Sequence, residues 1–154
     1  MKLLNGEIVL SQRPTHRQLK KLAGEGFTDV VTLLGKLESP ETIANTVKHT
    51  SMEWTWLPIS FYDKDLHPYA SPERMAVLVK KLIRKLEEGR KIFLHCAAGI
   101  DRTGIVIYTL LVALGEQEPL QMIREERPEI LPRLSSERRE WCYSIAALIL
   151  TNKV

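Results

Sequence analysis

Cysteine is scarce in this 154-residue sequence, which contains only Cys96 and Cys142. So few cysteines exclude a disulfide-stapled secreted fold and favour a compartment in which thiols stay reduced. The sequence also has no N-terminal signal pattern, and its apolar runs at 104–114 and 145–150 are too short to span a bilayer. We therefore expect a cytoplasmic protein that does not enter a membrane.

Neither sign of charge dominates, since 22 Lys and Arg residues stand against 19 Asp and Glu residues. The basic residues are interspersed with acidic ones, so the composition does not indicate a nucleic-acid-binding protein. Internal repeats, low-complexity tracts and interdomain linkers are absent too, and a 44% hydrophobic content suits one globular domain with its own core. We predict a single domain over residues 1–154 and expect a monomer.

What the sequence does contain is a short segment at 95–104, His-Cys-Ala-Ala-Gly-Ile-Asp-Arg-Thr-Gly, between an apolar strand and an apolar helix. If the strand stops at Cys96 and the helix starts near Arg102, the intervening amides converge on one point and form a nest for an anion. The Arg102 guanidinium can meet two oxygens of a tetrahedral phosphate at once, which lysine cannot do. The loop amides expected to bind phosphate are those of Ala97, Ala98, Gly99, Ile100, Asp101 and Arg102.

This arrangement predicts that Cys96 is a nucleophile. A free thiol has a pKa of about 8.5, which a helix N-terminus and a nearby cation lower by one to several units. The thiolate would attack phosphorus and form a cysteinyl-phosphate, which splits one difficult displacement into two easier ones. We expect His95 to orient the loop, Thr103 to donate its hydroxyl to the sulfur, and Arg102 with the amides to stabilise the equatorial oxygens.

These residues match a known signature of His-Cys, five residues, Arg and then Ser or Thr. On them the chain resembles the cysteine-dependent protein tyrosine phosphatases, in their compact dual-specificity-like form. Rhodanese-like domains and arsenate reductases have similar loops, but the flanking strand and helix and the added His, Gly and Thr favour the phosphatases. The segment 11–15 and the pair Arg127-Pro128 also resemble that family, so the likeness covers nearly the whole chain. It implies hydrolysis of phosphotyrosine, and also of phosphoserine and phosphothreonine, in protein or peptide substrates, with no metal and no cofactor.

The resemblance also implies a general acid, because the leaving oxygen needs a proton. In the family an aspartate on a loop about thirty residues before the cysteine supplies it, and the segment Pro58–Ala70 contains Asp63 and Asp65. Asp63 follows its strand as the family acid does, and Asp65 is the alternative. Asp101 is a third candidate, because one bacterial branch has an aspartate just before the arginine.

Three other functions stay open at this point. Phosphoinositide-directed relatives commonly carry a lysine within the loop, where this chain has Ala97, Ala98 and Ile100, so a lipid substrate is disfavoured but not excluded. RNA 5'-triphosphatases use the same loop and would need a basic surface beside it, which the composition does not indicate. A non-catalytic phosphate-binding module would bind its ligand without turnover.

Hydrophobic periodicity predicts strands at 7–11, 27–34, 52–57 and 91–95. Helices are expected at 15–24, 40–49, from Ser71 to about 86, and at 103–114, 119–127 and 135–151. This alternation indicates an α/β fold with a central, mostly parallel sheet of four to five strands flanked by helices, as in dual-specificity phosphatases. We further predict that Trp54 and Trp56 lie on opposite faces of their strand and that Cys142 is a small core residue.

Overall fold

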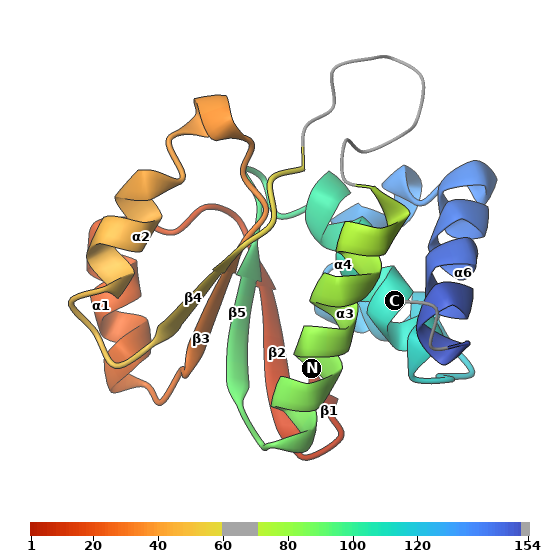
Figure 1. The fold of residues 1–154 in the computed structure, drawn as a ribbon, viewed down its shortest axis with the longest axis horizontal. Helices are drawn as coiled ribbons and strands as arrows, with labels where there is room; N and C mark the ends of the chain where they lie inside the picture. The colour runs from red at the N-terminus through yellow and green to blue at the C-terminus, as the bar shows by residue number, and fades with distance from the viewer. Residues whose placement is uncertain (60–70, 152–154) are drawn as a thin grey trace.

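The computed structural model describes residues 1–59 and 71–151, in which five strands form one sheet (Figure 1). The strand order is β1-β2-β5-β3-β4, and every neighbouring pair is parallel except β1 and β2. The strands are β1 (Lys2–Leu3), β2 (Gly6–Ser11), β3 (Asp29–Thr32), β4 (Glu53–Trp56) and β5 (Lys91–His95). The predicted fold class is therefore confirmed. The additional strand β1 is only two residues long, too short for a periodic signal.

Helices cover both faces of the sheet (Figure 1). The helices α1 (His16–Gly24) and α2 (Glu41–Val47) lie on one side. On the other side are α3 (Pro72–Glu87), α4 (Asp101–Ala113), α5 (Pro119–Glu126) and α6 (Ser136–Leu150), with the short 3-10 helix η2 (Pro128–Arg133). A second 3-10 helix, η1 (Lys36–Glu38), follows β3. Within the described ranges, no helix combines the length and apolar character needed to cross a membrane.

Local sequence signals start several of these helices. At α1 the Thr15 hydroxyl accepts a hydrogen bond from the Gln18 amide, and the Gln18 side chain accepts one from the Thr15 amide, which is the predicted capping box. Ser71 caps α3 in a similar way through the Arg74 amide, and Pro72 occupies the first helical position. The predicted starts of these two helices are confirmed.

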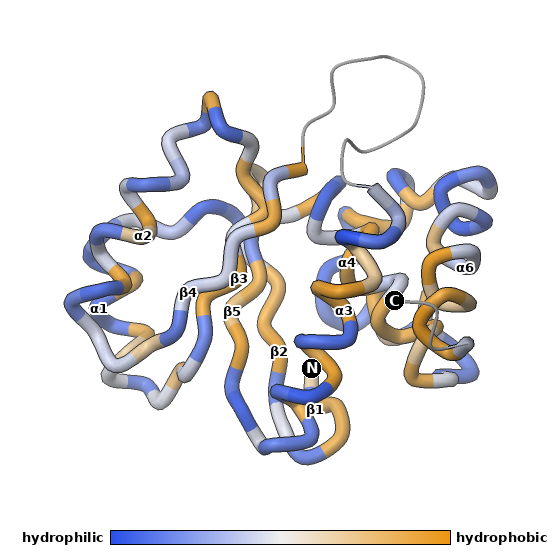
Figure 2. Tube along the Cα trace, viewed as in Figure 1, coloured by the Kyte–Doolittle hydropathy of each residue, from blue (hydrophilic) through white to orange (hydrophobic). Residues whose placement is uncertain are grey.

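Two hydrophobic cores hold the layers together, one on each face of the sheet. The smaller core packs α1 and α2 on the sheet through residues such as Leu19, Val30 and Phe93. The larger core includes most of α4, whose residues 102–111 are buried all round, as expected for a central helix. Figure 2 shows that the central strands β2 and β5 are mainly apolar, whereas apolar and polar residues alternate along the helices on either side.

The strand register aligns three residues at the carboxyl end of the sheet. Ser11 of β2 and Thr32 of β3 both pair with His95 of β5, the last residue of that strand. Ligands bind at this end of parallel sheets, because the loops that follow the strands converge there. The segment that begins with Cys96 therefore emerges at the centre of the sheet, between two neighbouring strands.

The prediction that Trp54 and Trp56 lie on opposite faces was wrong. Their rings stack with centroids 6.0 Å apart, and both indole nitrogens donate toward β3 and the residues after it, to Thr32 Oγ1 and to the Leu34 carbonyl. Side chains in a strand alternate with a period of two, so residues i and i+2 share a face.

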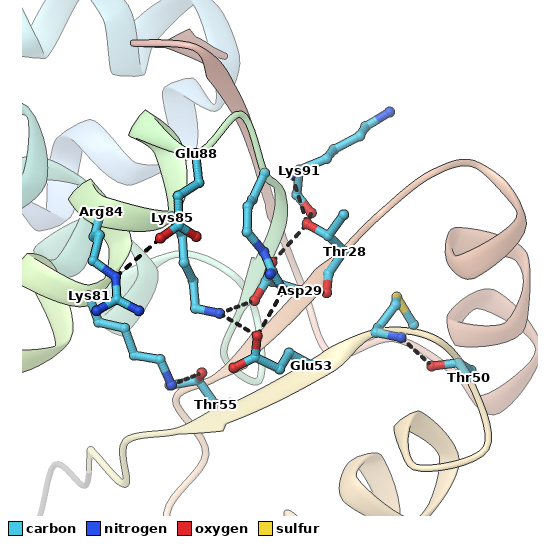
Figure 3. Close-up of polar contacts among 12 residues, drawn as sticks. Thr28, Asp29, Thr50, Glu53, Thr55, Lys81, Arg84, Lys85, Glu88 and Lys91 are labelled. Carbon is cyan, nitrogen blue, oxygen red and sulfur yellow. Dashed lines mark hydrogen bonds and ion pairs between the residues drawn. The ribbon is translucent and has the colours of Figure 1, made fainter.

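An ionic cluster lies at the opposite, amino end of the strands (Figure 3). Lys85 of α3 donates to Asp29 at 2.6 Å and to Glu53 at 2.8 Å, and Arg90 binds the same two carboxylates. Asp29 and Lys85 are almost fully buried. Burial is the largest influence on Asp29 and raises its pKa, but the hydrogen bonds from Arg90, Lys85 and Thr28 outweigh it and leave the pKa below its ordinary value. This cluster ties α3 to β3 and β4.

Candidate functional site

Cys96 lies in the turn between the end of β5 and the start of α4, and its side chain is almost fully buried. Its Sγ accepts two hydrogen bonds, from the Gly99 amide at 3.1 Å and from Thr103 Oγ1 at 3.3 Å. Burial is the largest influence on the thiol and raises its pKa, but the bonds from the Thr103 hydroxyl and amide and the charge of Arg102 bring the pKa below its ordinary value. The structure thus stabilises the thiolate form.

Hydrogen bonds to the carbonyl oxygens of the loop fix the direction of its amide N–H groups. Three consecutive carbonyl oxygens each accept a hydrogen bond from a nitrogen outside the 96–101 turn. The pairs are Cys96 O with His95 Nδ1 at 3.2 Å, Ala97 O with Arg13 N at 3.0 Å and Ala98 O with Arg127 Nη2 at 3.0 Å. A trans peptide is planar, so its N–H points away from its C=O. With the carbonyls held outside, the amides that follow them face inward, as the Gly99 amide on the sulfur demonstrates.

Gly99 is required at its position for two reasons. Its φ is +70°, in the left-handed region that favours glycine. A Cβ there would lie 2.3 Å from the carbonyl carbon and oxygen of Ser11, which are backbone atoms that cannot move aside easily. The loop thus packs directly on the end of β2 and the start of the segment after it, which contains Arg13.

The Arg102 guanidinium is held by three groups. Its Nη1 donates to the carbonyls of Leu33 at 3.2 Å and Ile59 at 3.1 Å, and Nη1 and Nη2 together bind the two carboxylate oxygens of Glu38. Burial opposes its charge, but Glu38 and the Cys96 sulfur raise the pKa of Arg102 above its ordinary value. A guanidinium has five N–H donors. Within residues 1–59 and 71–151, these bonds leave the edge formed by Nε and the remaining Nη2 hydrogen for the thiolate and a bound phosphate.

Glu38 is the functional residue that sequence reasoning missed. It ends η1, and its carboxylate also accepts the Gly35 amide at 2.6 Å. The hydrogen bond from Arg102 is the main reason that its pKa lies below the ordinary value, with burial opposing. Because 64 residues separate Glu38 from Arg102, no local sequence signal connects them.

The three candidate general acids differ in what can be said of them. Asp63 and Asp65 lie outside the described residues. The Asp101 carboxylate accepts a hydrogen bond from Arg138 Nη1 at 3.0 Å and lies 4.0 Å from Arg133 Nε. It therefore faces η2 and α6, where its charge is matched by two arginines.

His95 and Cys142 are both buried but in different surroundings. Burial is the main reason that the pKa of His95 falls to about 4, so its ring is neutral near pH 7. Cys142 lies in the larger core, where its Sγ is 3.7 Å from the Ile105 carbonyl and burial raises its pKa to about 11. Its prediction as a core residue is confirmed.

Comparison with known proteins places this geometry in a family context. A model of the DSP-PTPase phosphatase domain of the Swiss Army Knife proteins matches residues 3–146. The comparison with curated proteins gave no match.

Solved structures with the same fold share little sequence with this chain. The active form of Tk-PTP is 23% identical over 95% of both chains, with a TM-score of 0.75. PTPMT1 is 17% identical over 96% of this chain and 94% of its own, with a TM-score of 0.73, and it has also been crystallised with PI(5)P. The core catalytic domain of the PP-IP phosphatase SIW14 from S. cerevisiae is 19% identical over 96% of this chain and 89% of its own, with a TM-score of 0.68.

Proposed function

Because the chain belongs to the DSP-PTPase phosphatase domain family of the Swiss Army Knife proteins, we propose that it hydrolyses phosphotyrosine, and also phosphoserine and phosphothreonine, in proteins. One observation carries the chemistry. The buried Cys96 sulfur accepts the Gly99 amide and the Thr103 hydroxyl, and the charge of Arg102, held in place by Glu38, acts on the same sulfur.

In the first step the Cys96 thiolate attacks phosphorus, and the bond from phosphorus to the leaving oxygen breaks as the sulfur–phosphorus bond forms. Arg102 and the amides of the loop bind the equatorial oxygens in the transition state. The leaving oxygen takes a proton from an aspartic acid, for which Asp63 remains our proposal, with Asp65 and Asp101 as alternatives.

In the second step water attacks the cysteinyl-phosphate and releases inorganic phosphate. The aspartate formed in the first step accepts a proton from this water, and the electron pair of the sulfur–phosphorus bond returns to Cys96. The Thr103 hydroxyl, 3.3 Å from the sulfur, stabilises the departing thiolate.

The preference for protein substrates rests on the loop and its surroundings. Ala97 and Ala98 are exposed and carry no charge that would bind additional phosphates. The sequence has no long aromatic-rich segment that would build a deep pocket for phosphotyrosine alone, which supports the broader specificity. We also propose that the protein is a monomer in the cytoplasm, where thiols stay reduced.

A phosphorylated inositol is the second candidate substrate. It is favoured by two proteins of the same fold, the PP-IP phosphatase SIW14 and PTPMT1, the latter crystallised with PI(5)P. Both are below 25% identical to this chain, so they show a shared fold and leave the substrate to experiment.

The test is a metal-free hydrolysis assay on phosphotyrosine and phosphoserine peptides, PI(5)P and 5'-triphosphate RNA. We expect the wild-type protein to release phosphate from the peptides and Cys96→Ser to be inactive while still binding phosphate. Cys142→Ala serves as the matched control, because it changes the other buried thiol outside the site. Release from the lipid or the RNA alone would replace the substrate, and no release from any of them would refute a phosphatase.

A further inference from the structure

The buried His95 ring is hydrogen-bonded through both of its nitrogens. Nδ1 lies 3.2 Å from the Cys96 carbonyl oxygen, and Nε2 lies 2.9 Å from Thr32 Oγ1 on the neighbouring strand β3. The same Thr32 oxygen lies 2.9 Å from the indole nitrogen of Trp54, on the edge strand β4. A hydrogen-bonded chain thus runs across three strands and ends at the backbone of the nucleophile.

The direction of each bond follows from what its groups can do. An indole nitrogen only donates and a carbonyl oxygen only accepts. Trp54 therefore donates to Thr32, and His95 Nδ1 must carry the proton that bonds to the Cys96 carbonyl. In a neutral ring Nε2 is then the acceptor, so the Thr32 hydroxyl donates to it. In this arrangement every donor of the chain is used once, whereas a proton on Nε2 would leave the Thr32 hydroxyl hydrogen without an acceptor in the chain and the Cys96 carbonyl without its donor.

This tautomer matters because the Cys96 carbonyl is the first of the three loop carbonyls whose hydrogen bonds orient the loop amides. If the ring carried its proton on Nε2, Nδ1 would have no hydrogen for that carbonyl, and the following peptide plane would be free to turn. The Ala97 amide belongs to the same peptide plane, so its N–H would then turn away from the anion nest.

We propose that Thr32 and Trp54 are positioning residues of the catalytic site, which select the Nδ1-protonated tautomer of His95 and thereby hold the first peptide plane of the loop in its phosphate-binding orientation. The inference rests on the proposed function, since it concerns the same nucleophile. It adds two residues on β3 and β4 that make no contact with the reacting atoms.

The electrostatic surroundings are compatible with this role. Among the described residues, the charged groups that act on the ring and the thiolate are Arg13 from the segment after β2 and Arg102 from α4, with Glu38 bound to Arg102. Both arginines disfavour a positive imidazolium, and burial disfavours it further. The ring is therefore neutral at the pH of an assay, and the choice between its tautomers falls to its hydrogen-bond partners.

The first measurement is the tautomer itself, read from the ¹⁵N shifts and two-bond couplings of His95 in protein labelled with ¹⁵N-histidine. We expect a protonated Nδ1 in the wild-type protein and a mixture of tautomers in Thr32→Val, which keeps the shape of threonine and removes its hydroxyl. Trp54→Phe tests the far end of the chain and should shift the tautomers in the same direction. Thr32→Ser restores the hydroxyl and should restore the wild-type spectrum.

The second measurement is functional, on the same variants. Loss of one hydrogen bond of ordinary strength predicts that kcat for p-nitrophenyl phosphate falls roughly threefold to tenfold in Thr32→Val. The pH at which iodoacetamide alkylates Cys96 at half its maximal rate should rise. Thr109→Val is the matched control, because Thr109 is equally buried but its hydroxyl bonds within α4 to the Ile105 carbonyl.

The outcomes separate the inference from the proposed function. A protonated Nε2 in the wild-type protein, or a Thr32→Val variant with an unchanged tautomer and alkylation profile, would overturn the inference while leaving the phosphatase intact. A wild-type protein with no turnover would overturn the proposed function, whatever the tautomer. If Thr32→Val does not fold, Trp54→Phe still decides, because an unchanged tautomer and alkylation profile in that variant would also overturn the inference.

Discussion

Glu38 places a negative charge next to a site built to hold anions. A free carboxylate there would repel a phosphate, but both of its oxygens are bound to the Arg102 guanidinium. The pair fixes the plane of the guanidinium and leaves its other edge for the substrate. At the scale of single residues, the position of Arg102 therefore depends on a carboxylate that lies 64 residues away in the sequence.

Replacing Glu38 with Gln should lower kcat/KM by roughly tenfold. Hydrogen bonds to charged groups are worth about 1.5–3 kcal/mol, and the lower end applies because 36% of the Glu38 side chain is exposed. The measurement is steady-state hydrolysis of p-nitrophenyl phosphate together with the inhibition constant of inorganic phosphate, which should rise. Glu41→Gln, an exposed carboxylate at the start of α2, is the control. Equal rates for Glu38→Gln and Glu41→Gln would mean that Arg102 needs no partner.

At the scale of elements, the loop that follows Cys96 is shaped by neighbours that come from distant parts of the chain. Arg127, just after α5, reaches the Ala98 carbonyl, and the Arg13 amide reaches the Ala97 carbonyl. The loop therefore takes its form from the packing of α5 and of the segment after β2, in addition to its own strand and helix.

Arg127→Met tests this contribution. Methionine keeps the aliphatic length of the side chain but cannot donate to the Ala98 carbonyl. We expect faster hydrogen exchange at the loop amides and a loss of roughly threefold to tenfold in kcat/KM. Arg124→Met is the control, because Arg124 is exposed on α5 and donates to Gln121 on the same helix. Equal losses of kcat/KM in both variants would mean that the effect comes from α5 as a whole and not from the hydrogen bond to the Ala98 carbonyl.

Local signals predicted the elements well, whereas long-range partners could not be predicted. The Thr15 and Gln18 capping box and the Ser71 cap lie within four residues, so the sequence alone identifies those helix starts. Strand β5 matches its predicted range because it is apolar and ends directly at the loop. Strand β3 is shorter than predicted, at four residues, because the apolar run extends into segments without strand pairing.

The partners of the candidate site residues lie far from them in the chain. Glu38 contacts Arg102 across 64 residues and Thr32 contacts His95 across 63, so each pair exists only once the sheet has formed. The prediction for Trp54 and Trp56 fails for a different reason, because residues two positions apart in a strand share a face. The loop Cys96–Thr103 was predictable because its chemistry depends on residues that are close in sequence.

At the scale of the whole molecule, the ionic cluster at the amino ends of the strands should dominate the response to acid. Lys85→Met keeps the stem of the side chain and removes the charge that binds Asp29 and Glu53. Removing one partner of a buried ion pair typically destabilises a protein by about 3–5 kcal/mol. We expect a loss of roughly 3 kcal/mol in the free energy of unfolding, measured by urea denaturation. Arg84→Met, whose ion pair with Glu88 is exposed, should change stability by less than about 0.5 kcal/mol.

The pH dependence of the same variant provides a separate check. The pKa of Asp29 is lowered in the folded protein, so its contribution is complete above its unfolded value of 3.8 and is lost as the pH falls through the lower folded value. Without Lys85, burial acts on Asp29 with fewer opposing bonds, so its folded pKa should rise. The acid-unfolding midpoint of Lys85→Met should therefore lie at higher pH than that of the wild-type protein. Identical midpoints would mean that Arg90 alone keeps Asp29 charged.

The ionic cluster and the loop occupy opposite ends of the same strands, and this separation has an evolutionary consequence. Substitutions in the segments after β3 and β5 can change the surroundings of Cys96 without touching the cluster that ties α3 to the sheet. Variants with changes near Cys96 therefore keep the contribution of the ionic cluster to the free energy of folding. A fold divided in this way can diversify its chemistry while its sequence drifts, which fits the low identity between this chain and other proteins of the same shape.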